Sequence, residues 1–161
     1  MPFVIDNSVV CGWFLSNQAT PYTEAIAQRL LDGTAIAPGL WPLELANVLR
    51  TACKRGALVA QRAQEISAEI CALPITIDAE PQSPAALHAL ALRFDLSRKR
   101  RAAPSFLDPR GGRAGRSPAP GALTSDDAAY LELALRLQLP IATQDAALMQ
   151  AAMAAGVGVA R

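Results

Sequence analysis

The chain opens with Pro2-Phe3-Val4-Ile5-Asp6-Asn7-Ser8, a short apolar run that ends abruptly in polar residues. Such a run is typical of a buried strand, and the polar residues after it favour an immediate change to a helix. Asp6 is therefore expected at the carboxyl end of the first strand. What this carboxylate can meet depends on how the later strands are arranged around the first one.

Four further apolar runs predict strands at residues 35–37, 74–77, 140–143 and 157–159. Helical spacing of apolar residues, together with caps and glycine stops, predicts helices over residues 21–33, 41–55, 60–73, 85–94, 125–135 and 145–155. Strands that alternate with helices of roughly 10 to 15 residues imply a parallel sheet covered on both faces. The predicted fold class is α/β, a three-layer α/β/α sandwich with a central parallel sheet of about five strands. The 161 residues fit a single domain over 1–161.

The charge is small in total but unevenly distributed. The formal net charge is +1, yet residues 98–124 hold seven basic residues and one acid, whereas the remainder holds eight basic residues and thirteen acids. The same segment is rich in Pro and Gly, which prevent regular structure, so we expect a basic, disordered insertion over 98–124. Three interpretations stay open. The segment is a loop that grips RNA phosphates, a solvated insertion, or a stretch foreign to the fold, such as a reading-frame scar.

Several classes of protein are disfavoured by composition. No apolar run approaches the roughly 18 to 20 residues of a membrane-spanning helix, and no basic residue precedes Arg29, unlike the start of a signal peptide. The three cysteines are far apart and lack a CxxC pair, so they predict neither a disulfide framework nor a zinc site. We therefore expect a cytoplasmic protein without a membrane partner.

Four acids from distant parts of the sequence are expected at one edge of the sheet. Asp6 and Asp145 follow strands directly, while Glu44 and Asp127 begin helices. Helix starts and strand ends lie on the same side of a parallel sheet, which is where ligands of such sheets bind. Converging carboxylates repel one another, and a hard divalent cation relieves this repulsion. The sequence thus predicts an oxygen-ligand site for Mg²⁺ or Mn²⁺ and chemistry on a phosphodiester. Asn47, one turn after Glu44, is expected to orient that carboxylate.

Four pieces of the sequence resemble one family. They are VIDNS (4–8), WPLELANVL (41–49), DAAYLELA (127–134) and LPIATQD (139–145), in that order. The chain resembles the PIN-domain ribonucleases, and specifically the VapC-like toxins of bacterial toxin-antitoxin pairs.

The resemblance, which covers everything except the basic segment, implies a PIN-like fold and endonucleolytic cleavage of RNA with Mg²⁺ or Mn²⁺. It also implies pairing into a homodimer and neutralisation by a cognate antitoxin. By the same resemblance Asp6, Glu44, Asp127 and Asp145 would be the catalytic, metal-binding acids. Ser8 and Thr143 would be their hydroxyl supports.

Two departures from the family pattern leave an alternative open. The segment 98–124 enters just before the third acid, and Asp126 stands where family members often carry an aromatic or apolar residue. Asp126 could therefore replace or assist Asp127. The alternative is a catalytically impaired protein of the same fold that only binds antitoxin or RNA, because the insertion disturbs Asp127. Aspartyl phosphotransferases and receiver domains also place acids at strand ends, but the Asp-x-Asp and late-strand Lys of those proteins are not found here.

Overall fold

The centre of the fold is a parallel sheet. The computed structural model describes residues 1–15, 18–99 and 123–161, and within them the strands are β1 (Phe3–Ile5), β2 (Ala35–Ala37), β3 (Ile75–Ile77) and β4 (Ile141–Ala142). Their order is β3-β2-β1-β4, and all three pairings are parallel. Val4 lies opposite both Ile36 and Ile141, so β1 is an inner strand. The α/β class and the parallel arrangement predicted from the sequence are confirmed.

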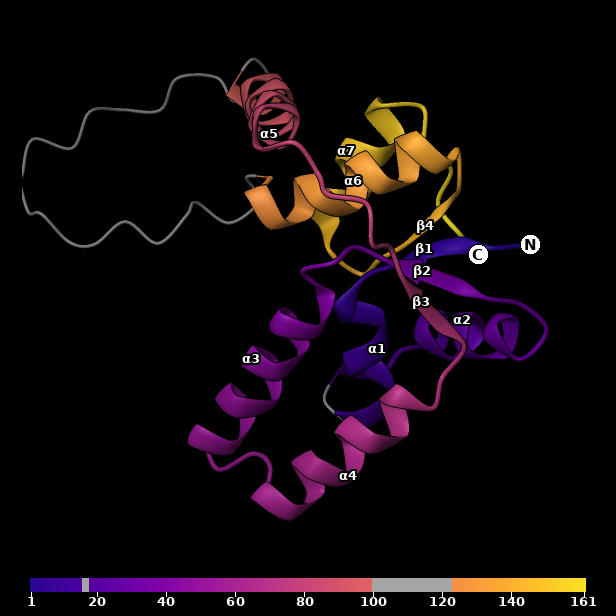
Figure 1. Ribbon diagram of the computed structural model, residues 1–161, viewed down its shortest axis with the longest axis vertical. Coiled ribbons are helices and arrows are strands. Elements are labelled where there is room, and N and C mark those ends of the chain that lie inside the picture. Colours follow the sequence, from indigo (N-terminus) through magenta and orange to yellow (C-terminus); the bar gives the residue numbers. More distant parts are fainter. Residues whose placement is uncertain (16–17, 100–122) are drawn as a thin grey trace, which may run out of the picture.

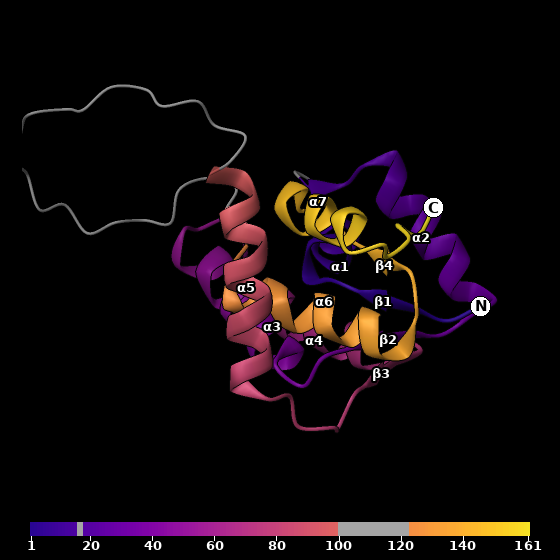
Figure 2. The ribbon, with the colours of Figure 1, turned by 90° about the horizontal axis from the view of Figure 1, so that it is seen from above.

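Helices cover both faces of this sheet (Figure 1). On one face lie α5 (Pro84–Lys99), α6 (Ser125–Leu137) and α7 (Ala146–Ala154); on the other lie α1 (Asn7–Phe14), α2 (Pro21–Leu31), α3 (Trp41–Lys54) and α4 (Ala60–Cys71). Figure 2, which views the sheet from above, shows α6 and α7 over the strands, with α5 beside α6. None of the helices in the described ranges is both long and apolar enough to cross a membrane.

The prediction of about five strands is wrong by one strand within the described residues. Residues 157–159 form only an isolated parallel bridge, in which Val159 pairs with Ile141. Gly156 adopts φ +80° directly after α7, so the chain turns sharply and reaches the edge of β4 for a single pairing. The segment does cover that edge, because Ile141 N donates to Gly158 O and Ala160 N donates to Ile141 O.

The boundaries of the basic segment also differ from those predicted. Helix α5 continues past its expected end at residue 94 to Lys99, so residues 98 and 99 are helical. At the other end Leu123 is buried and Thr124 caps α6. Residues 100–122 of the predicted insertion lie outside the described residues. Both junctions therefore belong to the folded domain.

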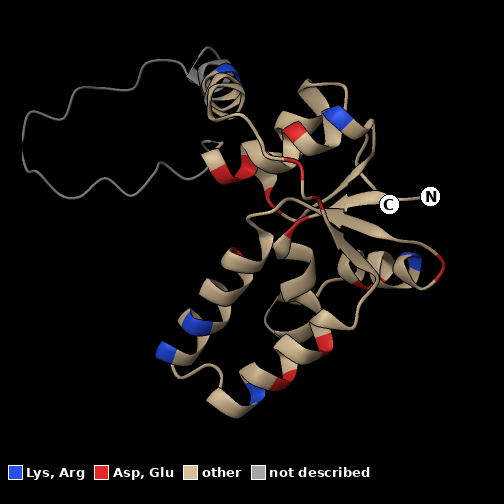
Figure 3. Cartoon of the chain, viewed as in Figure 1, with Lys and Arg blue, Asp and Glu red and all other residues tan. Residues whose placement is uncertain are grey.

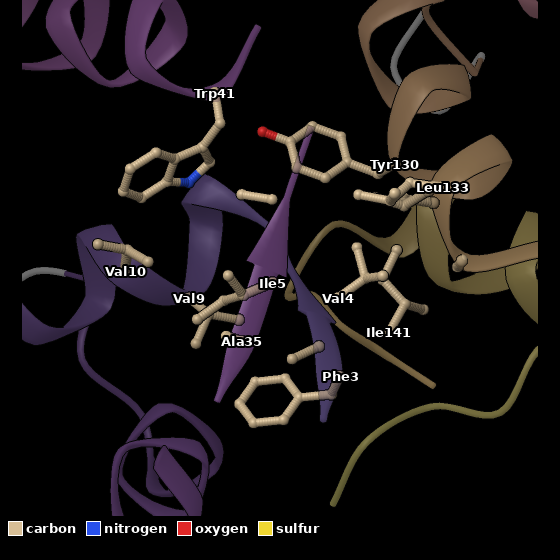
Figure 4. Packing of buried hydrophobic residues seen from close by; sticks show 14 of the residues in the cluster. Phe3, Val4, Ile5, Val9, Val10, Ala35, Trp41, Tyr130, Leu133 and Ile141 are labelled. Carbon is tan, nitrogen blue, oxygen red and sulfur yellow. The ribbon is translucent and has the colours of Figure 1, made fainter. Parts of the chain in front are cut away.

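Strand β1 lies in the middle of the core. Its three side chains are fully buried, and Figure 4 shows them between residues of β2, β4, α1 and α6. Trp41 and Tyr130 close the core on the side where β1 ends. Each large apolar side chain buried here stabilises the fold by about 1.5–3 kcal/mol. The packing therefore fixes where Asp6, the next residue after β1, must lie.

A set of ion pairs fixes α6 to the loop between β3 and α5. Arg136 of α6 contacts Asp78, and it lies 2.8 Å from Glu80 and 3.2 Å from Glu132. Gln82 Nε2 donates to the backbone oxygen of Ala129 on the same helix, at 2.8 Å. Because α6 begins with two acids of the candidate site, this attachment also sets the position of those acids.

Candidate functional site

Asp6 is buried at the carboxyl end of β1, with 8% of its surface exposed. Its Oδ2 accepts hydrogen bonds from Ser8 Oγ at 2.5 Å and from Thr143 Oγ1 at 2.7 Å. Ser8 lies in α1 and Thr143 follows β4, the neighbour of β1. Pairing of the two strands thus brings the hydroxyl of Thr143 onto a carboxylate that is 137 residues away in the chain.

A second set of hydrogen bonds locks these supports in place. Gln144 donates from its backbone N to Ser8 Oγ at 2.8 Å and from Nε2 to the backbone oxygen of Ser8 at 2.9 Å. Asp145 N donates to Thr143 Oγ1 at 2.9 Å. The chain leaving β4 is therefore tied to the start of α1, and the hydroxyl groups around Asp6 have defined orientations.

Burial raises the pKa of Asp6 above its usual value. The hydrogen bonds from Ser8 and Thr143 act in the opposite direction, and the charge of Asp127 raises the pKa further. Burial is the largest of these effects because an ionised carboxyl group loses its hydration there. The ionised form of Asp6 is therefore costly in this environment unless a positive charge joins it.

Glu44, in the first turn of α3, is held by two residues that the sequence did not single out for this role. Its Oε2 accepts one hydrogen bond from Asn7 Nδ2 at 3.0 Å and another from the hydroxyl of Tyr130. Tyr130 is 1% exposed, and burial together with the neighbouring acids raises its pKa far above the usual range, so its hydroxyl remains a neutral donor. Burial is also the main cause that raises the pKa of Glu44, and the charges of Asp6 and Asp126 add to it.

Asp127 and Asp145 each use one carboxylate oxygen to cap a helix. Asp127 Oδ2 accepts from the backbone N and the Oγ1 of Thr124, both at 2.8 Å, at the start of α6. Asp145 Oδ1 accepts from the backbone N of Ala147 at 2.6 Å and of Leu148 at 2.9 Å, at the start of α7. Among the described residues neither acid has a hydrogen bond to its other oxygen. Each could therefore cap its helix and still offer an oxygen to a ligand.

The four acids act on one another through their charges. Asp127 raises the pKa of Asp6, and Asp6 raises that of Glu44. The pKa of Asp127 is raised mainly by burial and further by Asp145 and Asp126. Figure 3 shows acidic residues around the carboxyl ends of the strands and the start of α6. Asp126 thus stands close enough to influence two of the four acids, Glu44 and Asp127.

The donor chemistry of the site suits a hard cation, but the side chains are not drawn together as a metal cage. Carboxylate and amide oxygens are the ligands that Mg²⁺ and Mn²⁺ prefer. Asn7 Oδ1 is a buried oxygen with no hydrogen-bond partner in the described part of the chain, which makes it an additional acceptor beside Glu44. Within residues 1–15, 18–99 and 123–161, no three His, Cys, Asp or Glu side chains are grouped closely enough to hold a metal ion.

Asn47 does not take the place expected for it. It is exposed, and no hydrogen bond joins it to Glu44 in the described part of the chain. It lines a pocket of about 820 Å³ instead. The amide that contacts Glu44 is that of Asn7, which directly follows Asp6. Tyr130 lies three residues after Asp127, so helical spacing from the third acid was the one signal that could have identified it.

The chain matches no known protein-family profile and no curated protein sequence. What the fold and the site define is an α/β protein with a parallel sheet and a group of mutually repelling carboxylates at the carboxyl edge of that sheet.

Proposed function

We propose that this chain is a metal-dependent endoribonuclease with a PIN-like α/β/α fold, which hydrolyses RNA phosphodiester bonds as a toxin neutralised by a cognate antitoxin. The observation that supports the proposal most directly is the group of acids Asp6, Glu44, Asp127 and Asp145. They come from four separate segments, and in three of them burial and neighbouring charge raise the pKa. Such an arrangement is costly for the fold alone and useful to a protein that binds a divalent cation.

The residues present fit Mg²⁺ or Mn²⁺ by donor type. Asp6 would be the central ligand because Ser8 and Thr143 fix its carboxylate. Glu44 would be held in orientation by Asn7 and Tyr130. A bound divalent cation would lower the pKa of an attacking water and neutralise charge on the phosphate.

The free oxygens of Asp127 and Asp145 would be available to hold the cation, while their other oxygens continue to cap α6 and α7. The acids would also orient the attacking water by accepting its hydrogen bonds. Pairing into a homodimer and binding of an antitoxin are part of the proposal; light scattering would test the first, and co-purification with a candidate antitoxin would test the second.

The decisive experiment is cleavage of a structured RNA by the purified chain with Mg²⁺ or Mn²⁺, compared with the same reaction in EDTA. Asp6→Asn should abolish cleavage, because the amide keeps the shape of the side chain but removes its charge. Asp32→Asn is the matched control, since Asp32 is an exposed acid at the end of α2. Equal cleavage by wild type and Asp6→Asn, or cleavage that persists in EDTA, would refute the proposal.

One observation favours a second candidate, a catalytically impaired protein that only binds antitoxin or RNA. The carboxylate of Asp127 is engaged with Thr124 at the junction with the basic segment. If that engagement withholds Asp127 from the metal, Mn²⁺ binding measured by electron paramagnetic resonance would be retained without RNA cleavage. Activity in the first experiment excludes this candidate.

A further inference from the structure

The pocket that Asn47 lines begins one turn of α3 beyond Glu44 and has no role in the chemistry described above. It is bounded by the end of α1, by α3, and by the turn that leads to α4, and its volume is about 820 Å³. Phe14 supplies an aromatic ring, and Gln18, Asn47 and Thr51 supply polar side chains. Volumes of roughly 300–1,000 Å³ with a few polar groups are typical of small-ligand sites, so this pocket can take a nucleotide-sized group.

The pocket and the candidate site share one face of α3. Glu44, Asn47, Thr51 and Arg55 follow one another at helical intervals of three or four residues, which places them along a single line. At 1.5 Å per residue, the line from Glu44 to Arg55 is roughly 16 Å long. A strand that has one phosphate at Glu44 would therefore pass over the pocket before reaching Arg55.

The far end of α3 is basic. Arg50, Lys54 and Arg55 are all exposed, and within the described ranges none of their side chains forms an ion pair or a hydrogen bond. Arg55 lines the pocket itself, and Arg50 and Lys54 lie on adjoining faces of the same helix end. Arg62 and Arg136, by contrast, are paired with acids. Figure 3 shows the basic end of α3 pointing away from the acids at the sheet edge. Free cations beside a pocket provide the phosphate contacts that single-stranded nucleic acid requires.

We infer that this pocket and the three cations bind the segment of single-stranded RNA next to the phosphate that is cleaved. One base stacks on Phe14 within reach of Asn47 and Thr51, and the flanking phosphates contact Arg50, Lys54 and Arg55. This subsite rests on the proposed function, because it presupposes that the acids act on RNA. It adds the path of the substrate and the preference for an unpaired strand, since a base within a duplex cannot enter the pocket.

RNA binding without cleavage tests the subsite directly. In the full-length Asp6→Asn protein with EDTA, fluorescence anisotropy with a labelled single-stranded RNA gives the affinity across a range of salt concentrations. Replacing Arg50, Lys54 and Arg55 together with Gln should lower the salt slope, log K against log [salt], by about 2, because each phosphate contact on a single strand contributes about 0.7. For the single substitutions, Arg55→Gln should lower the slope, whereas Arg29→Gln on α2, which removes the same charge, should not.

A second variant tests the space for the base separately from the phosphate contacts of the three cations. Ala52 lines the pocket, so Ala52→Trp obstructs part of the space between Phe14, Asn47 and Thr51 and should weaken binding of the single strand at least fivefold with the salt slope unchanged. Circular dichroism and thermal melting establish that the variant is folded. Equal affinity of the obstructed and open pockets, or binding of duplex RNA as tight as that of a single strand, would overturn the subsite.

The outcomes separate the two proposals. If wild type cleaves RNA with metal but neither the triple variant nor Ala52→Trp weakens binding, the subsite is wrong and the ribonuclease stands. If wild type binds RNA through these residues without cleaving it, the RNA-binding surface stands, but its place beside a cleaved phosphate and the enzymatic function are wrong. If it neither binds nor cleaves RNA, both proposals are overturned.

Discussion

Tyr130→Phe removes a single buried hydroxyl and should destabilise the protein through Glu44. The hydroxyl donates to Glu44 Oε2 from a position that is 1% exposed. A hydrogen bond to a charged group contributes about 1.5–3 kcal/mol. Asn7 still donates to the same oxygen, so the carboxylate of Glu44 keeps one hydrogen bond. We therefore expect the free energy of unfolding to fall by about 2 kcal/mol. For a domain of this size that corresponds to a fall in Tm of about 4–8 °C.

The assay is urea denaturation at pH 7 in EDTA, carried out as a double-mutant cycle with Glu44→Ala. If the hydroxyl acts through Glu44, Tyr130→Phe should cost at least about 1 kcal/mol less in the Glu44→Ala background than in wild type. Tyr22→Phe is the matched control, because Tyr22 is the other tyrosine of the chain and its hydroxyl accepts from Thr143 N at 3.3 Å. Equal costs of Tyr130→Phe in both backgrounds would refute the network around Glu44.

Three further predictions concern the acids and the attachment of α6. Since burial and Asp127 raise the pKa of Asp6, its ionisation opposes folding, so in EDTA the free energy of unfolding should fall as pH rises from the usual aspartate pKa to that raised pKa. Asp6→Asn should flatten this dependence, and a urea midpoint that changes with pH in Asp6→Asn as much as in wild type would contradict the prediction. Arg136→Ala removes the ion pair with Asp78 and should cost about 1 kcal/mol, with a smaller loss in 1 M NaCl; a loss that salt does not reduce would argue against an electrostatic attachment. Thr124→Ala removes the capping box of α6 and should cost about 1 kcal/mol in thermal unfolding, whereas Thr124→Ser should cost little; equal losses would show that the hydroxyl is not the stabilising group.

Sequence patterns predicted the elements whose signals are local. The apolar runs before Asp6 and before Gln144 are short and sharply bounded, and both proved to be strands of the sheet. The run at 157–159 is equally apolar, but the turn at Gly156 allows it only one pairing with Ile141. The end of α5 was also predicted too early, at residue 94 instead of Lys99. The apolar periodicity stops at residue 94, and nothing in the polar, basic sequence after it marks where the helix ends. Edge pairing and helix ends depend on neighbours that are distant in the chain.

The same distinction applies to the candidate site. Asp6 directly follows β1, and Asp145 caps α7 three residues after the end of β4, so both could be placed from the rule that a parallel sheet brings strand ends together. The roles of Asn7 and Tyr130 could not be predicted in this way. Their contacts with Glu44 span 37 and 86 residues and depend on the packing of α1, α3 and α6. Asn47 was expected at Glu44 from spacing along one helix, yet the contact is made from a different helix. Spacing predicts which residues share a face, but not what that face meets.

The central place of β1 has a consequence for biosynthesis. This strand leaves the ribosome well before β4, yet its pairing with β4 and the hydrogen bond from Thr143 to Asp6 need residues that are made much later. At about 5–20 residues per second, the 137 positions between those two residues take roughly 7–27 s to translate. Throughout that interval Asp6 lacks its hydrogen bonds with Ala142 and Thr143, and the acids of the site are not yet together. Any activity that depends on the assembled carboxylates can therefore begin only after β4 and Thr143 have been made, and truncated chains that end before β4 should lack it.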